Sequence, residues 1–186
     1  MKKENNNNYI IAEIYIKEEN INKKIRIINS YEEYRRNYNL KIEDEIKKCV
    51  IKINNELIPF KYFYKFKSKG KYIIQYSFKN NINKTCCMFS DCSSLTNINL
   101  SNFNSNNVTN MRWMFFGCSS LTNINLSNLN INNVSKMESI FWGCSSLKKE
   151  NIISNDETIR DIKINQPTIT VKIIYDLLKD NHLITI

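Results

Sequence analysis

The tetrapeptide CSSL occurs three times, beginning at residues 92, 118 and 144, so the same motif returns every 26 residues. The two complete units read CSSLTNINLSNFNSNNVTNMRWMFFG and CSSLTNINLSNLNINNVSKMESIFWG. A period of about 20 to 29 residues with leucines at fixed positions is typical of leucine-rich repeats. A unit of this size cannot bury its apolar residues alone, so neighbouring units must stack, and this requirement constrains the fold more than any other feature.

Each unit changes its apolar spacing half-way. In the first half, Ile98 and Leu100 alternate with polar residues, as in a strand with one buried face. In the second half, apolar residues follow a helical spacing between Thr109, a good helix N-cap, and Gly117, a residue that commonly follows the last helical turn. We therefore predict that each unit contains a strand, a turn, a short helix and a second turn.

The segments on either side of the repeats are expected to complete the fold. Apolar and polar residues alternate in residues 9–16 and 72–78, which predicts strands. We expect residues 9–27 to form a hairpin and the strand at 72–78 to act as an incomplete first repeat. The expected fold class is α+β: a small antiparallel β-rich N-terminal unit (residues 1–71) runs directly into a short leucine-rich-repeat (strand–short helix) solenoid (residues 72–155). A C-terminal cap and tail (residues 156–186) follows, with a capping helix.

The net charge of +9 is concentrated at one end of the chain. Residues 1–80 hold 18 basic and 10 acidic side chains, whereas residues 81–147 hold 3 and 2. A basic nucleic-acid or membrane-surface binder acting through residues 1–80 is therefore an alternative function. The lysines in residues 60–72 alternate with aromatic residues, and a half-buried strand with a solvated lysine face also explains this pattern.

The sequence contains neither an apolar run of membrane-spanning length nor a recognisable signal peptide. We therefore expect a cytoplasmic protein without membrane insertion, or a cell-surface protein if a leader is missing. The six cysteines form no CxxC motif, and His182 is the single histidine. Cys92, Cys118 and Cys144 share one repeat position and are expected to be buried thiols, while Cys86 and Cys87 should be partly exposed and are the most reactive candidates. We expect no enzyme activity, catalytic residue, cofactor or metal.

The string CSSLTNINLSNFNSNNVTNMRWMFFGC resembles the leucine-rich repeats of the BspA-like family of bacterial and protist surface proteins. The resemblance covers roughly residues 80–155 and rests on the spacing, the CSSL motif, the Val-Thr or Val-Ser pair and the Met-Phe pair. It implies a surface-exposed protein that mediates adhesion or other protein contacts.

The function that we predict is a non-catalytic protein-binding leucine-rich-repeat module, with a BspA-like cell-surface adhesin as an alternative. The partner would be a protein of unknown identity, and no specific nucleic acid is expected. The outer side of the repeat strands is the expected contact face. Its residues are Thr96, Asn97, Asn99, Thr122, Asn123, Asn125, Lys148, Lys149 and Asn151.

Overall fold

The computed structural model of the chain describes residues 8–30 and 45–160. This part is mostly β, and it contains no helix of seven or more residues. None of its helices is long and apolar enough to cross a membrane. The elements in chain order are β1 (Tyr9–Ile16), η1 (Glu18–Asn20), β2 (Lys24–Arg26), η2 (Glu45–Lys48), β3 (Val50–Ile53), β4 (Glu56–Ile58), β5 (Phe63–Lys65), β6 (Gly70–Ser77), β7 (Leu95–Asn99), β8 (Asn123–Asn125), η3 (Lys149–Asn151), β9 (Ile152–Ile153) and α2 (Glu157–Arg160).

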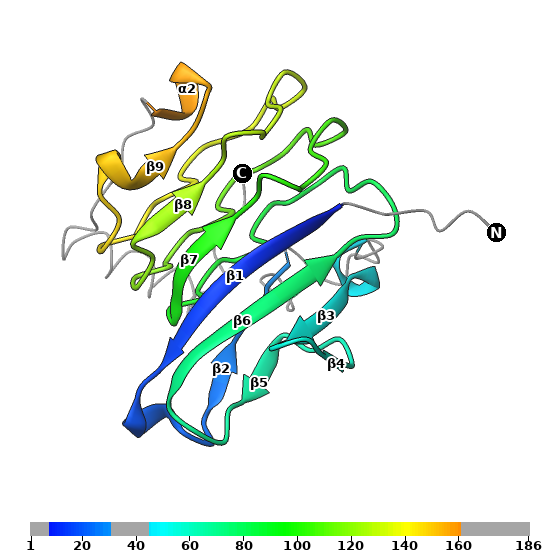
Figure 1. Cartoon of the computed structure of the whole chain (residues 1–186). Helices are drawn as coiled ribbons and strands as arrows, with labels where there is room; N and C mark the ends of the chain where they lie inside the picture. Colours follow the sequence, from blue (N-terminus) through cyan, green and yellow to red (C-terminus); the bar gives the residue numbers. More distant parts are fainter. Residues whose placement is uncertain (1–7, 31–44, 161–186) are drawn as a thin grey trace, which may run out of the picture.

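Seven strands form one mixed sheet in the order β4-β3-β6-β1-β7-β8-β9 (Figure 1). The central strand β1 pairs antiparallel with both β6 and β7, whereas β7, β8 and β9 pair in parallel. The expected hairpin over residues 9–27 is wrong, because β2 pairs with β5 in a separate sheet. All eight residues of β1 pair with residues of β6, whereas β2 has three residues and could pair with only part of β1.

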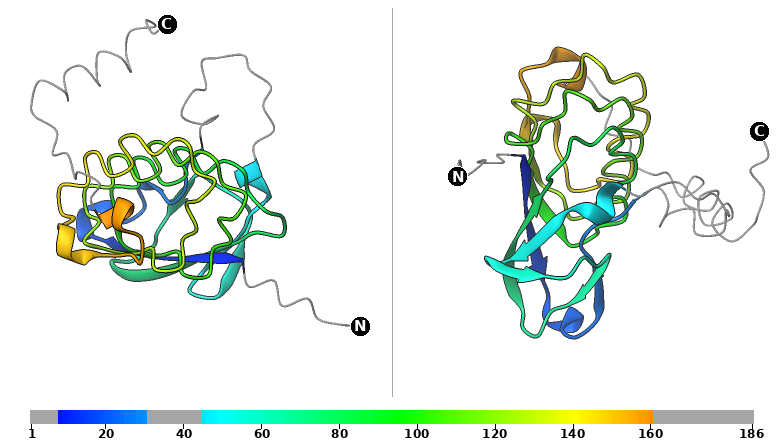
Figure 2. Two further views of the ribbon diagram at one scale, coloured as in Figure 1. Left: turned by 90° about the horizontal axis from the view of Figure 1, so that it is seen from above. Right: turned by 90° about the vertical axis from the view of Figure 1, so that its right-hand side faces the viewer.

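The repeats stack with the offset that their sequence period predicts. Ile98 lies beside Ile124 in the parallel pair of β7 and β8, 26 residues apart. Parallel bridges also join Lys84 to Asn110 and Asn110 to Lys136. We call the turn of chain around each of these three residues a coil: the first coil contains Lys84, the second Asn110 and the third Lys136. The three coils overlie one another (Figure 2). However, the first coil contributes no parallel strand, because β1 occupies the place beside β7 and β6 lies beyond it. The expectation that the strand at 72–78 acts as a stacked first repeat is therefore wrong.

The second half of each repeat is a run of turns and not the expected short helix. The amide of Phe89 donates to Met114 O in the next coil at 2.8 Å, and the amide of Cys87 donates to Arg112 O at 3.1 Å. The amide of Met88, which lies between them, donates within its own coil, to Thr85 O at 3.0 Å. In an α-helix each amide after the first turn donates to the carbonyl four residues before it, so the bonds between coils replace the helix.

Thr109 also forms its hydrogen bonds with the neighbouring coil. Its amide and its hydroxyl donate to Asn83 O, at 3.0 and 3.4 Å, so the side chain does not act as a helix N-cap. Gly117 does adopt the left-handed conformation expected from the sequence, with a φ of 72°. It does so inside a turn and not at a helix end.

The predicted α+β class is consequently wrong: the described chain is 31% strand and 9% helical, and it forms a mixed sheet that does not close. It contains no solenoid of alternating strands and helices. The described part of the tail contains the four-residue α2, and the expected capping helix falls on residues 161–186, which lie outside the described chain. The expected boundary between residues 71 and 72 falls within β6.

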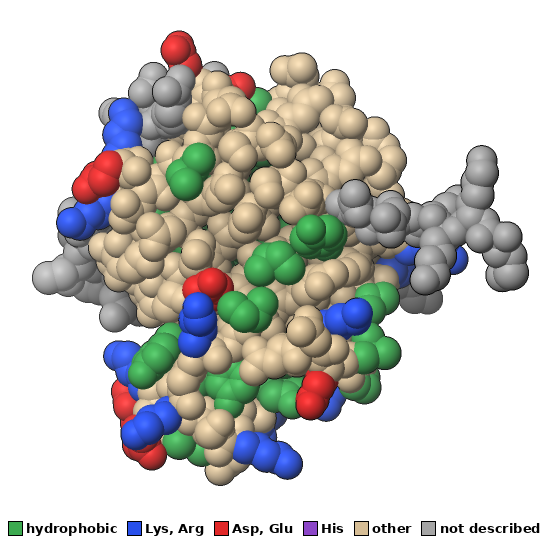
Figure 3. All heavy atoms as spheres, viewed as in Figure 1, with side chains coloured by type: hydrophobic (Ala, Val, Ile, Leu, Met, Phe, Trp, Pro, Cys, Tyr) green, Lys and Arg blue, Asp and Glu red, His purple; other side chains and the backbone are tan. Residues whose placement is uncertain are grey.

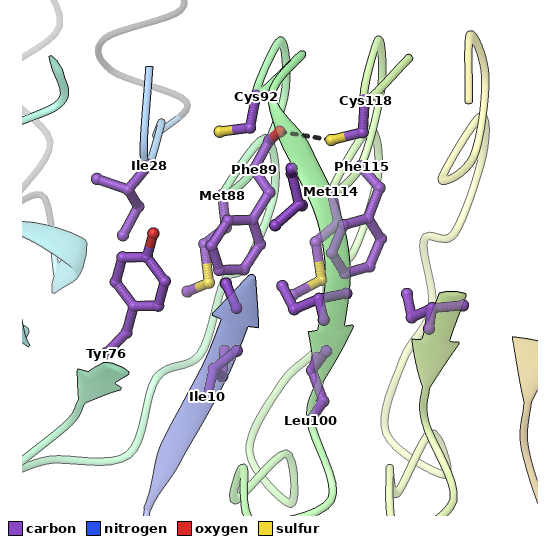
Figure 4. Close-up of a cluster of buried hydrophobic side chains, with 14 of the residues drawn as sticks. Ile10, Ile28, Tyr76, Met88, Phe89, Cys92, Leu100, Met114, Phe115 and Cys118 are labelled. Carbon is purple, nitrogen blue, oxygen red and sulfur yellow. Dashed lines mark hydrogen bonds between the residues drawn. The ribbon is translucent and has the colours of Figure 1, made fainter. Parts of the chain in front are cut away.

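The core lies between the inner face of the sheet and the turns of the stacked coils (Figure 4). Aromatic rings form a row through it, each fully buried. The ring centroids of Tyr76 and Phe89 are 5.3 Å apart, those of Phe89 and Phe115 are 5.7 Å apart, and those of Phe115 and Phe141 are 5.8 Å apart. The last two pairs are stacked, because each coil places the same side chain at the same height.

The N-terminal segment closes one end of the stack. Asn29 is buried, and its backbone amide donates to Met88 O at 2.7 Å while its Nδ2 donates to Ser90 O at 2.9 Å. These two carbonyls belong to the first coil, which has no preceding coil to supply donors. Asn29 therefore satisfies polar groups that would otherwise be buried without partners.

Candidate functional site

The outward side chains of the large sheet form a continuous surface that we call the outer face. One row of cross-strand neighbours runs through all seven strands, and a second row runs through four. The outer face is defined by these two rows: Leu57, Lys52, Gln75, Ile11, Asn99, Asn125 and Ile153 in the first, and Ile73, Glu13, Asn97 and Asn123 in the second. Alternate residues such as Ile10 and Ala12 point into the core, so strand periodicity places these rows outward.

The outer face carries little charge. Lys52 and Glu13 are its charged members, and Glu13 pairs with Lys71 through an Nζ to Oε2 distance of 3.5 Å. The space-filling view shows mainly uncharged polar surface over the repeat strands, hydrophobic side chains along its middle, and more Lys and Arg over the N-terminal part of the sheet (Figure 3). The surface thus combines amide groups with aliphatic ones.

Six of the nine contact residues expected from the sequence come together on β7 and β8 or next to them. Asn97 lies beside Asn123 and Asn99 lies beside Asn125. The amide of Thr122 donates to Thr96 O at 2.9 Å, which keeps the two threonines in the same register.

Four of these six side chains hold the fold as well as facing outward. Thr96 Oγ1 donates to Glu13 O at 3.1 Å, and Thr122 Oγ1 donates to Thr96 O at 2.9 Å. Asn99 Oδ1 accepts from the amide of Ser101, and Asn125 Oδ1 accepts from that of Ser127, two residues on, at 2.8 and 3.0 Å. These contacts tie strands together and start the turns that follow them. The Asn123 side chain donates only to its neighbour in sequence, from Nδ2 to Thr122 Oγ1 at 3.0 Å. Asn97 and Asn123 are therefore the strongest candidates for a contact role.

The other three expected contact residues are not in the predicted register. Ile152 lies beside Ile124 at an offset of 28 residues instead of 26, so Ile153 takes the place that the repeat predicted for Asn151. Lys148 and Lys149 are exposed but lie at the start of η3, outside the strand. The physical reason is that η3 adds residues between the last CSSL motif and β9.

The cysteines at the repeated position are buried thiols, as predicted. The thiol of Cys118 donates to Phe89 O at 3.0 Å, and that of Cys144 donates to Phe115 O at 3.1 Å (Figure 4 shows the first). Burial raises the pKa of Cys118 and Cys92, and it raises the pKa of Cys144 to about 12. These thiols therefore stay protonated, and those of Cys118 and Cys144 act as hydrogen-bond donors between coils.

Cys86 and Cys87 are also buried, so the expected partial exposure of this pair is wrong. Their turn directs both side chains away from solvent. Within the described ranges, no group of three or more His, Cys, Asp and Glu side chains is placed to hold a metal ion.

A sequence family described as "Mycoplasma protein of unknown function, DUF285" matches residues 60–166. This is more than half of the 186 residues. The chain belongs to the DUF285 family. The matched region of this DUF285 protein begins just before β5 and includes β6 to β9, whereas β1 lies outside it. No curated protein and no solved structure matches the chain.

Sequence reasoning missed the contribution of β1 and β6 to the outer face. Ile11 and Glu13 sit between the β6 side chains Ile73 and Gln75 and the asparagines of β7. The alternation in residues 9–16 predicted that Glu13 faces away from the buried residues, and this is confirmed. Nothing in that local pattern indicated that the strand would pair with the first repeat strand.

Proposed function

We propose that this DUF285 protein is a non-catalytic protein-binding module and that the outer face is its contact surface. The observation that carries the proposal is the composition of this face: two rows of neighbouring side chains with few charges, made of amides and aliphatic groups across seven strands. The centres of protein interfaces are depleted in charged residues. Sites for nucleic acid, in contrast, depend on Lys and Arg that contact phosphates.

The resemblance of the repeats to those of BspA-like surface proteins supports a protein partner and extends the proposal to contacts at a cell surface. The stacking of the repeats also favours a binding role, because neighbouring coils present equivalent side chains at regular spacing. Asn97 and Asn123 form such a pair. A partner that offers backbone or amide groups in extended form could bond both in the same way.

The test compares capture of a partner by three forms of the full chain. Asn123 is exposed, so Asn123→Glu places a charge on the outer face without burying it. Asn97→Glu is less suitable, because the new carboxylate would lie beside Glu13. The matched control is Asn132→Glu, which makes the same change at an exposed position outside the strands.

Each immobilised form is incubated with extract and surface proteins of the source cell, and any protein captured by the wild type is purified and titrated directly. We expect the Asn132→Glu chain to bind like the wild type. Asn123→Glu should weaken the affinity by about tenfold or more, which corresponds to roughly 1.4 kcal/mol. Equal affinity of all three forms, or equal loss in both variants, would remove the outer face from the proposal.

The alternative is binding of nucleic acid through residues 1–80. Exposed lysines such as Lys61, Lys65 and Lys67 lie in the N-terminal part of the chain, in and around β5. A titration with duplex DNA distinguishes the two functions. Binding that disappears near physiological salt fits non-specific attraction, whereas sequence-selective binding that survives there would favour the alternative.

A further inference from the structure

Cys86 and Cys87 are adjacent in the chain, and their sulfur atoms lie 3.8 Å apart. Successive side chains of an extended strand point to opposite sides, so this proximity depends on a turn. The amide of Met88 donates to Thr85 O at 3.0 Å, and Cys87, at the third position of this four-residue turn, has a φ of 60°. A hydrogen bond across four residues with a left-handed third residue is the signature of a type II turn.

The stacking of the repeats imposes this turn. Trp113 and Ser139 occupy the equivalent positions of the next two coils, and their φ angles are 58° and 54°. The amide of Cys87 also donates to Arg112 O in the second coil at 3.1 Å. The two sulfurs are therefore held side by side by a backbone conformation that all three coils share.

The cysteines at the repeated position lie one to a coil, each without an adjacent cysteine in the chain. Cys118 and Cys144 each donate a thiol hydrogen to a carbonyl of the preceding coil. We infer that Cys86 and Cys87 form a dithiol site for small-molecule disulfides, which oxidise it reversibly to a disulfide between the two adjacent residues. This inference goes beyond the proposed binding function and does not depend on the outer face.

The reaction is a thiol–disulfide exchange in two steps. Cys86 has 6% of its surface exposed and Cys87 has 0%, so Cys86 is the point of entry. Its thiolate attacks one sulfur of the oxidant, a bond forms between protein and oxidant, and one thiol leaves. The thiolate of Cys87 then attacks the Cys86 sulfur and releases the second thiol. The protein loses two protons and two electrons, and the oxidant is reduced to two thiols.

The product should be easily reduced. Adjacent Cα atoms are about 3.8 Å apart, which is less than the separation of about 4.4–6.8 Å found across most disulfides. Strained disulfides have higher reduction potentials and are the labile or regulatory ones. Ring closure also turns the peptide that carries the amide of Cys87, so oxidation should weaken its bond to Arg112 O, which joins the first two coils.

The experiment treats the reduced, native full chain with a large excess of oxidised glutathione, without added reduced glutathione, and follows its intact mass. We expect the loss of two hydrogen atoms without retained glutathione, and full recovery of the original mass with dithiothreitol. Cleavage after Phe89 separates Cys86 and Cys87 from Cys92, so fragmentation of that peptide assigns the bond. An unchanged mass, or glutathione retained on Cys86, would overturn the inference.

Two variants act as controls. Cys87→Ser should retain glutathione on Cys86, because the second step is removed, and serine is native at the equivalent position 139. Cys92→Ser should still lose two hydrogen atoms. If this loss disappears in Cys92→Ser, the bond involves Cys92 and the inference is wrong. The peptide assignment in the wild type decides the question even if a variant does not fold.

Discussion

Gly117 lies where two neighbouring coils come so close together that a side chain meets the preceding coil. Its φ is 72°, and a Cβ atom added there would lie 2.7 Å from Oδ1 of Asp91 in the preceding coil. The left-handed conformation costs an L-residue about 1–2 kcal/mol. The obstructing atom is the end of the Asp91 side chain, so displacing it adds about 1 kcal/mol, the lower end of the overpacking range. We therefore expect Gly117→Ala to lower the free energy of unfolding by roughly 2–3 kcal/mol.

Urea unfolding of the full chain measures this loss. A decrease of about 3 kcal/mol lowers the urea midpoint by roughly 1–3 M for ordinary slopes. Asp91→Gly in the Gly117→Ala background removes the obstructing carboxylate and should recover the overpacking part, about 1 kcal/mol, as an interaction energy in a double-mutant cycle. Gly70→Ala is the control, because a Cβ there meets nothing within 4 Å and the cost comes from its backbone angle alone. If the effects of Asp91→Gly and Gly117→Ala simply add, the clash between coils is not the cause.

Three further predictions concern the core, the pH dependence and the thiols. Leu126→Ala should cost about 2–5 kcal/mol in urea melts, because the side chain is buried; Asn125→Ala should cost about 1 kcal/mol through its lost turn bond, and equal costs would contradict the register. Arg112 lowers the pKa of Glu138 to about 2, chiefly through a side-chain hydrogen bond. The folded-state pKa is depressed, so this exposed pair should add a small stability above the ordinary carboxyl pKa that is lost as the pH falls toward 2, and Arg112→Gln should flatten that part of the stability profile. Burial raises the pKa of Cys144 to about 12, so iodoacetamide should alkylate this thiol only after denaturation, and fast labelling of the native chain would disprove its burial.

The stacking of the repeats could be predicted from the sequence, whereas the conformation of their second half could not. The 26-residue period placed Ile98 beside Ile124 and predicted the buried Cys118 correctly. Apolar residues three positions apart suit a helix, but they also suit a series of turns in which every third residue returns to the core. The two conformations differ in their hydrogen bonds: in the series of turns, alternate amides donate to the next coil, as the amide of Phe89 does. The sequence of a single repeat does not include the carbonyl that accepts this bond.

The candidate contact surface was predicted in part for the same reason. Within β7 and β8 the repeat fixed which residues face outward, so Asn97 and Asn123 came together as expected. The prediction failed at β9, where η3 shifts the offset to 28 residues, and it did not include β1. Strand pairing across long sequence separations depends on which edges are left open in the folded molecule, and local alternation does not encode it.

The position of β1 in the sheet has a consequence for how the protein is made. Its partners β6 and β7 begin at residues 70 and 95, so a strand that ends at residue 16 leaves the ribosome long before either edge it will occupy. Pairing between segments so far apart in the chain slows folding, because the entropy cost of closing the intervening loop comes before the contacts that stabilise the pair. Until then an apolar eight-residue segment remains open to association with other nascent chains. A chain of residues 60–166 expressed without β1 would also be prone to association, because β6 and β7 would each present an uncovered strand edge.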